Sequence, residues 1–204
     1  MHDKEQRILN CEPIELRAAV DSTAQILRGY AAKFNVLSQD LGGFREMIAP
    51  GAFDAVISND VRALLNHDPN HVLGRTLSGT ARIGIDATGL WYEVTLPDTQ
   101  TGRDLAESIK RGDITQSSFA FSIAPGGDSW AADETGAVLR TISKMGALYD
   151  VSPVTYPAYP DATIGMRTAA EFKEKSEQRK RADHEAARIR VANKRKHVTL
   201  FEKN

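Results

Sequence analysis

The sequence predicts an α+β fold: a mainly antiparallel, barrel-like body with a few flanking helices, followed by a charged C-terminal tail that is helical or disordered. Short apolar or alternating segments, separated by turn residues, recur from Ile26 to Pro157. This spacing is typical of many short strands. From Ala169 onward glycine and proline are absent and good helix formers dominate, with too few apolar residues for a core-facing stripe.

Composition and charge also separate a body from a tail. The chain has 204 residues, of which 41% are hydrophobic and 26% charged, as in an ordinary globular protein. Residues 169–204 hold 11 Lys or Arg and 6 Asp or Glu, a net charge of +5, which leaves −6 on the rest. We therefore expect an N-terminal segment over residues 1–25, one folded domain over 26–168 and a basic tail over 169–204.

Several classes of protein are disfavoured. Cys11 is the only cysteine, so no intrachain disulfide can form, and the N-terminus lacks the apolar stretch of a signal peptide. No segment approaches the roughly 18 apolar residues that span a membrane. Acidic residues interrupt the basic tail, which argues against nucleic-acid binding. The expected setting is a reducing cell interior, with no membrane partner and no cofactor.

Local patterns in the first half of the body predict particular elements. VRALL (61–65) is typical of a strand, and Pro50-Gly51 leads into a short predicted helix over residues 52–57. TARIGID (80–86) and LWYEVTL (90–96) alternate around a turn and predict a hairpin.

The second half of the body adds one helix and further strands. Apolar residues at helical spacing predict a helix that begins near Thr101 and ends at Gly112. TQSSFAFSI (115–123) alternates like a strand, residues 125–137 predict an exposed loop, and residues 137–157 return to strand character.

The serine-rich strand has two different faces. Successive side chains of a strand point to opposite sides, so Phe119 and Phe121 share a core-like face with Ser117. The other face carries Ser118, Ala120 and Ser122, which are all small. A serine hydroxyl becomes a useful nucleophile when a base takes its proton and a third group orients that base.

His67 is the candidate base, because it follows the apolar positions of VRALL at the point where the strand stops. The third group is open between Asp150, an acid within an apolar strand that needs a partner, and the turn-like Asp68 and Asp113. A metal site at His67, Asp68 and His71 is an alternative, but Pro69 prevents one helix from carrying both histidines. We therefore expect no metal.

Five stretches in order resemble the prohead (capsid maturation) serine proteases of tailed bacteriophages, a family similar in fold to the herpesvirus assembly proteases. They are GFREMIAPGAF (43–53), LLNHDPNHVLGRTLSGT (64–80), DATGLWYEVTLPDTQTGRDL (86–105), IKRGDITQSSFAF (109–121) and LYDVSPVTYPAYPDA (148–162). Together they span residues 43–162, most of the predicted body.

The resemblance implies a serine endopeptidase in which Ser118 is the nucleophile, His67 the base and Asp150 the third member. It also implies a herpesvirus-assemblin-like fold and work inside the immature capsid, in the host cytoplasm. The implied partners are the major capsid protein and its scaffolding segment, together with the enzyme itself through self-association and self-cleavage. The tail would then serve to target the enzyme or be trimmed away.

Two positions depart from the family pattern. Ala120 and Gln116 stand where glycine is common in the family. The methyl group of Ala120 narrows the small face, which keeps a second hypothesis open: a catalytically inactive assembly protein that uses the same fold as an internal scaffold.

Overall fold

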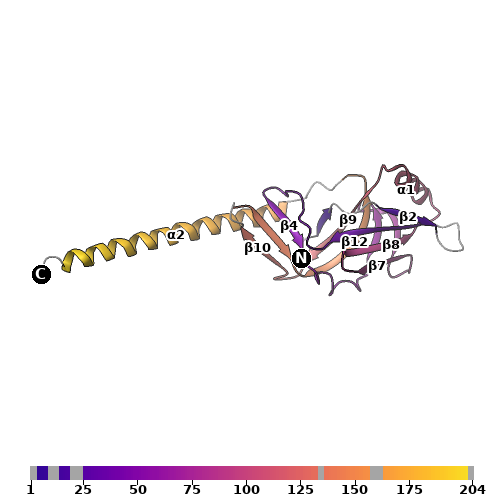
Figure 1. The fold of residues 1–204 in the computed structure, drawn as a ribbon. Coiled ribbons are helices and arrows are strands. Elements are labelled where there is room, and N and C mark those ends of the chain that lie inside the picture. Colours follow the sequence, from indigo (N-terminus) through magenta and orange to yellow (C-terminus); the bar gives the residue numbers. More distant parts are fainter. Residues whose placement is uncertain (1–3, 9–13, 19–24, 133–135, 157–162, 202–204) are drawn as a thin grey trace.

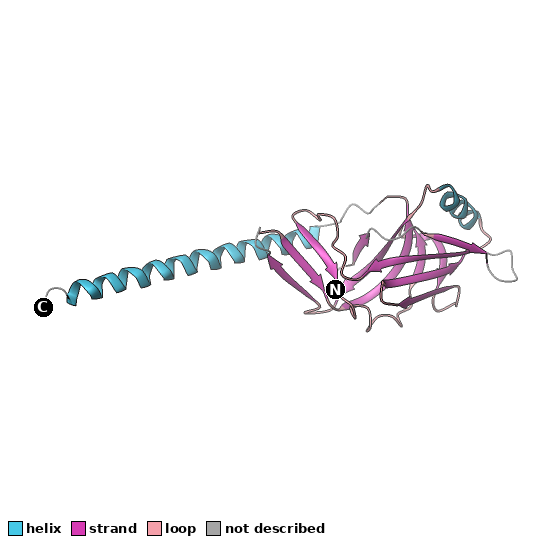
Figure 2. Cartoon of the chain, viewed as in Figure 1, coloured by secondary structure: helices cyan, strands magenta, loops and turns pink. Residues whose placement is uncertain are grey.

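The computed structural model describes residues 4–8, 14–18, 25–132, 136–156 and 163–201, so Cys11 lies outside the described residues. Within these ranges strands dominate and two helices are present, which confirms the α+β class (Figure 2). In chain order the elements are β1 (Glu5–Ile8), β2 (Glu15–Ala18), β3 (Gln25–Lys33), β4 (Phe44–Ile48), β5 (Arg62–Leu65), β6 (Asp68–Arg75), β7 (Ala81–Ile85), β8 (Gly89–Thr95), α1 (Gln100–Arg111), β9 (Gln116–Ile123), β10 (Asp128–Ala132), β11 (Val138–Ile142), β12 (Met145–Val154) and α2 (Thr163–Phe201).

The strands form three open sheets. Five strands lie in the order β1-β9-β12-β5-β6, four in the order β2-β3-β8-β7, and three in the order β10-β11-β4. Pairing is antiparallel except for β12 with β5 and β11 with β4, which are parallel.

The expected barrel is wrong, because the described sheets do not close on themselves. The two larger sheets instead stack, and their facing side chains form one apolar core. Tyr92 of β8 joins Ser117 of β9 across this interface through a hydroxyl–hydroxyl hydrogen bond of 2.7 Å. Stacking buries both apolar faces without requiring the edge strands to meet.

The helix α1 and the hairpin before it agree with the sequence. The strands β7 and β8 form the predicted antiparallel hairpin. Thr99 caps α1 by accepting a hydrogen bond from the Gly102 backbone N–H, and the helix ends at Gly112, whose φ of 80° is left-handed. Glycine suits that position because it adopts this conformation without a Cβ clash.

Two local predictions are wrong. Residues 52–57 form consecutive turns, because the backbone bonds join residues three apart, as from Val56 N–H to the Phe53 carbonyl at 2.9 Å. The predicted loop at 125–137, of which residues 133–135 lie outside the described part, contains β10. The indole of Trp130 packs on Phe44 with ring centroids 5.1 Å apart. This aromatic contact holds the strand against β4, although its Gly-, Asp- and Ala-rich surroundings predict a loop.

Phe53 lies at the centre of the core and provides a stability prediction. Its ring is fully buried and contacts Phe34 and Phe119, with centroids 6.1 and 5.7 Å away. We expect Phe53→Ala to lower the free energy of unfolding by about 3–5 kcal/mol, because it leaves a cavity in a packed interior. Urea unfolding measures this, with the exposed Leu77→Ala as the control that should change little.

The helix α2 runs away from the strands as a long rod (Figure 1). Near its start Ala169 is buried in a small cluster with Leu41, Phe44 and Val138, and Phe172 packs against it. Most described side chains beyond this cluster are exposed. Neither described helix combines the length and apolarity needed to cross a bilayer. The domain boundaries at residues 25 and 168 stay predictions.

Candidate active site

A tight turn between β5 and β6 positions His67. Asn66 and His67 are its two central residues, and both have positive φ, 54° and 59°, as a two-residue hairpin of type I′ requires. Three hydrogen bonds tie Asn66 to the end of β12: its N–H bonds the Pro153 carbonyl, and its side-chain amide exchanges two bonds with Thr155. These bonds hold a histidine in a conformation that non-glycine residues rarely adopt.

The ring of His67 lies between a carboxylate and a hydroxyl. Its Nδ1 is 2.5 Å from Asp150 Oδ1, and its Nε2 is 2.7 Å from Ser118 Oγ. All three side chains are almost fully buried. Because an ionised carboxylate only accepts, Nδ1 carries the proton toward Asp150, and the lone pair of Nε2 faces the serine.

The strands β9 and β12 bring the hydroxyl and the carboxylate together. Ser118 pairs with Ser152, and Ala120 pairs with Asp150, in antiparallel register. An irregularity in the pairing lies between Leu148 and Asp150. The small face of β9, predicted from alternation, therefore lies under the imidazole.

Electrostatic contacts keep Asp150 ionised. Burial alone would raise the pKa of this carboxyl, but the hydrogen bond and the electrostatic interaction with the His67 ring and the ammonium of Lys4, 3.2 Å away, lower the pKa below its ordinary value. Ser152 Oγ also donates to Asp150 Oδ1 at 3.1 Å. Sequence reasoning missed Lys4 and Ser152. The alternation of β12 places Ser152 on the same face as Asp150 and could have indicated Ser152. No signal in the sequence indicated Lys4.

The rival acids and serines have other contacts. Asp68 accepts from the backbone and side chain of Asn70 at the surface, and Asp113 forms an exposed ion pair with Arg111. Ser117 faces away from His67, toward Tyr92, and Ser122 accepts from the Tyr149 hydroxyl at 3.4 Å.

The alternative metal site at His67, Asp68 and His71 does not assemble. Both ring nitrogens of His67 face Asp150 and Ser118, whereas the half-exposed His71 lies 3.7 Å from Asp68 on β6. Within the described ranges, no group of three or more His, Cys, Asp or Glu side chains is arranged to hold a metal ion.

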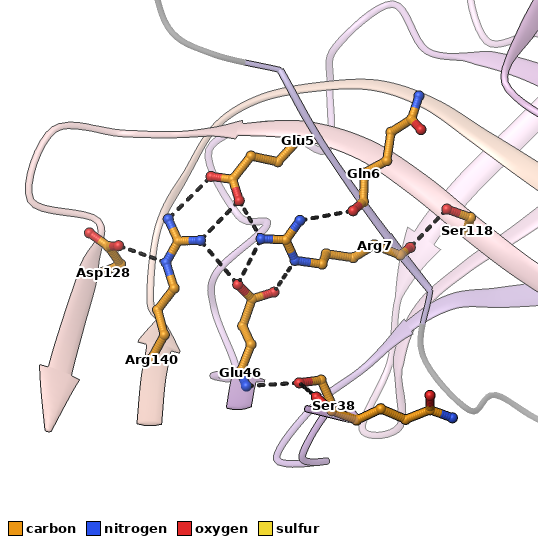
Figure 3. A network of polar contacts seen from close by, with 9 residues as sticks. Glu5, Gln6, Arg7, Ser38, Glu46, Ser118, Asp128 and Arg140 are labelled. Carbon is orange, nitrogen blue, oxygen red and sulfur yellow. Dashed lines mark hydrogen bonds and ion pairs between the residues drawn. The ribbon is translucent and has the colours of Figure 1, made fainter. Parts of the chain in front are cut away.

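The edge strand β1 covers the hydroxyl of Ser118. It pairs with β9 in antiparallel register, and Ser118 Oγ donates to the Arg7 backbone carbonyl at 2.9 Å (Figure 3). A serine hydroxyl has one proton, so it bonds either this carbonyl or the imidazole at any moment. A backbone carbonyl therefore lies beside a hydroxyl that an imidazole can deprotonate.

Comparison with known proteins supports the resemblance in the sequence. Residues 12–177 match the family model of the caudovirus prohead serine proteases. The chain belongs to this family. Among solved structures, the capsid assembly protease of bacteriophage T4 is similar in fold, with a TM-score of 0.52 and 14% identity over 76% of this chain and 98% of that chain. No curated protein matches the sequence.

Proposed function

We propose that this protein is a serine endopeptidase of phage capsid maturation. It acts inside the immature capsid in the bacterial host, where it removes the scaffolding segment of the major capsid protein and cleaves itself. The observation that carries this proposal is the hydrogen-bonded series Asp150–His67–Ser118 in a member of the prohead protease family. Hydroxyl, imidazole and carboxylate in this order form the arrangement of a serine protease.

His67 acts as general base and then as general acid. It takes the proton of Ser118 as Oγ attacks the carbonyl carbon of the substrate, and Asp150 stabilises the resulting imidazolium. The C–N bond breaks, the imidazolium gives its proton to the leaving amine, and the N-terminal part of the substrate stays bound as an ester of Ser118. Water then attacks this ester with His67 as base, which releases a carboxylate and restores the Ser118 hydroxyl.

The position of β1 supports self-cleavage as part of this function. The Arg7 carbonyl lies 2.9 Å from Ser118 Oγ, and the serine is fully buried beneath the strand. A substrate from another chain needs this place on the edge of β9, so β1 has to leave before the capsid protein can bind. The freshly folded protease is therefore a latent enzyme.

A phosphonate probe that reacts with activated serines tests the proposal. We expect it to label a peptide containing Ser118 in the full chain co-expressed with its capsid protein, because only a serine next to a base reacts readily. Labelling should persist in Ser122→Ala and in the presence of a chelator, and should disappear in Ser118→Ala. If no serine is labelled under these conditions, the inactive scaffold hypothesis, which Ala120 favours, is correct instead.

A further inference from the structure

Two side chains of β1 enter a buried cluster of charges. Glu5 and Arg7 lie on the same side of the strand, and both face Glu46 of β4 and Arg140 of β11 (Figure 3). Arg7 donates to both carboxylate oxygens of Glu46, at 2.9 and 3.2 Å. Arg140 donates to both oxygens of Glu5, at 2.9 and 3.1 Å.

We infer that the place of β1 is the substrate groove, in which Glu46 selects a basic residue directly before the cleaved bond and Arg140 selects an acidic residue two positions earlier. This inference rests on the proposed function and names its substrate class. An extended peptide bound by adding a strand to a sheet edge gains affinity from backbone bonds and specificity from alternate side chains. The first substrate is then the chain itself, at the bond between Arg7 and Ile8.

The register of β1 identifies the bond that is cleaved. The Arg7 carbonyl accepts from Ser118 Oγ, and Ile8 is the residue paired with Ser118. Attack on this carbonyl carbon breaks the Arg7–Ile8 bond, with one water consumed and the new amine formed on Ile8. Arg7 is thus the residue before the bond, and Glu5 lies two positions earlier, on the same side of the strand.

The two selecting residues, Glu46 and Arg140, contact each other as well as the side chains of β1. Glu46 and Arg140 pair across the parallel strands β4 and β11, where Glu46 Oε2 lies 3.1 Å from Arg140 Nη1. Asp128 also accepts from Arg140, at 2.8 Å. Without β1 the carboxylates of Glu46 and Asp128 therefore face the single guanidinium of Arg140. A basic substrate residue adds a second guanidinium for Glu46, and the acidic residue two positions earlier adds a carboxylate for Arg140, so each of the two substrate side chains has a partner of opposite charge.

Both selecting side chains are buried while β1 is in place. Glu46 and Arg140 are 3% and 5% exposed, and the Glu46 backbone N–H bonds Ser38 Oγ at 2.8 Å. Burial alone would lower the pKa of Arg140, but the carboxylates of Glu5, Glu46 and Asp128 raise the pKa above its ordinary value. A neutral side chain in place of Arg7 would leave a buried carboxylate short of a partner, which is costly.

The same tripeptide occurs a second time in the chain. Glu5-Gln6-Arg7 is repeated as Glu177-Gln178-Arg179 in α2, where all three side chains are exposed. This part of the helix has no apolar cluster to hold it, so it can unwind locally at low cost and enter a groove as a strand. We therefore expect a second cut between Arg179 and Lys180, which removes most of the basic tail.

Intact-mass measurement of the full chain, co-expressed with its capsid protein, tests the assignment. The expected products begin at Ile8 and at Lys180, and both are absent in Ser118→Ala. Arg7→Gln should slow the first cut by about 30-fold or more, the cost of removing one partner of a buried charge pair. Arg7→Lys keeps the charge but loses the bidentate hydrogen bonding to Glu46. The rate of its first cut should therefore lie between those of the parent and Arg7→Gln.

The tail offers matched variants that carry no folding risk. Arg179→Gln should abolish the second cut. Arg181→Gln should leave this cut intact, because Arg181 is equally exposed but has no acidic residue two positions before it. In the N-terminal region Arg17→Gln is the control. Arg17 also follows a glutamate by two residues, but it lies exposed in β2, which belongs to a different sheet from the strand of Ser118. The first cut should also keep its half-time on tenfold dilution, because enzyme and substrate are one molecule.

The outcomes separate this inference from the proposed function. If Ser118-dependent cuts occur elsewhere and no chain begins at Ile8, the specificity is wrong while the protease remains. The specificity is also wrong if Arg7→Gln and Arg179→Gln are cut as fast as the parent, and the assignment to one molecule is wrong if the half-time lengthens on dilution. If Ser118 neither reacts with the probe nor supports any cut, the proposed function falls, and the inference falls with it.

Discussion

Ser118→Ala is expected to leave a folded protein that cleaves the capsid protein at least about 10⁴-fold more slowly than the parent. The substitution removes the attacking oxygen, and one buried hydroxyl contributes little to folding compared with the surrounding core. The rate is measured from the time course of intact masses in mixtures of the full chain and the capsid protein. His67→Ala should produce a similar loss, and the double variant should be scarcely slower than either single one, because both residues act in one step.

Neighbouring serines on the same strand provide the controls. Ser117→Ala removes the hydrogen bond to Tyr92, and Ser122→Ala removes an acceptor for Tyr149. Both contacts lie away from the imidazole, so each variant should keep substantial activity even if its stability falls by about 1 kcal/mol. Cleavage by Ser118→Ala at the parent rate would exclude this serine as the nucleophile.

Much of the site's local geometry is accessible from the sequence, because strand alternation depends only on neighbouring residues. Alternation places Ser118 and Ser117 on opposite faces of β9, and the apolar run before His67 predicts a histidine at a strand end. Alternation does not distinguish Ser118 from Ser122, since both lie on one face. That distinction depends on where the turn after β5 lies, which is a long-range property of the fold.

Other features escaped prediction for the same reason. β1 has only four residues, and what identifies it as a strand is its pairing with β9, more than one hundred residues later. The charged side chains of Glu5 and Arg7 indicate a surface segment when read alone, because their partners Glu46 and Arg140 come from distant strands. The expected barrel was wrong because alternation reveals which face of a strand is buried but not whether edge strands meet.

Asp150→Asn is the second substitution with a large expected effect, a loss of about 10⁴-fold in the rate of capsid protein cleavage. The carboxylate accepts the Nδ1 proton of His67, which keeps the lone pair of Nε2 directed at Ser118. An asparagine amide can present its N–H₂ group to Nδ1 instead, which favours the wrong tautomer and leaves no negative charge to stabilise the imidazolium. Ser152→Ala, which removes only a hydroxyl beside the same carboxylate, should cost far less activity.

The dependence of stability on pH provides an independent test of the charge on Asp150. Because folding lowers the pKa of this carboxyl, its ionised form stabilises the folded state above the ordinary aspartate pKa of about 4, and this contribution is lost as the pH falls through the lower, folded value. Measured in the Ser118→Ala background, which prevents self-cleavage, the change in free energy of unfolding caused by Asp150→Asn should therefore be constant near neutral pH and shrink below about pH 4. A difference that instead grows as the pH falls would mean that Asp150 is protonated in the folded protein. A neutral carboxyl group could not hold His67 in the tautomer that activates Ser118.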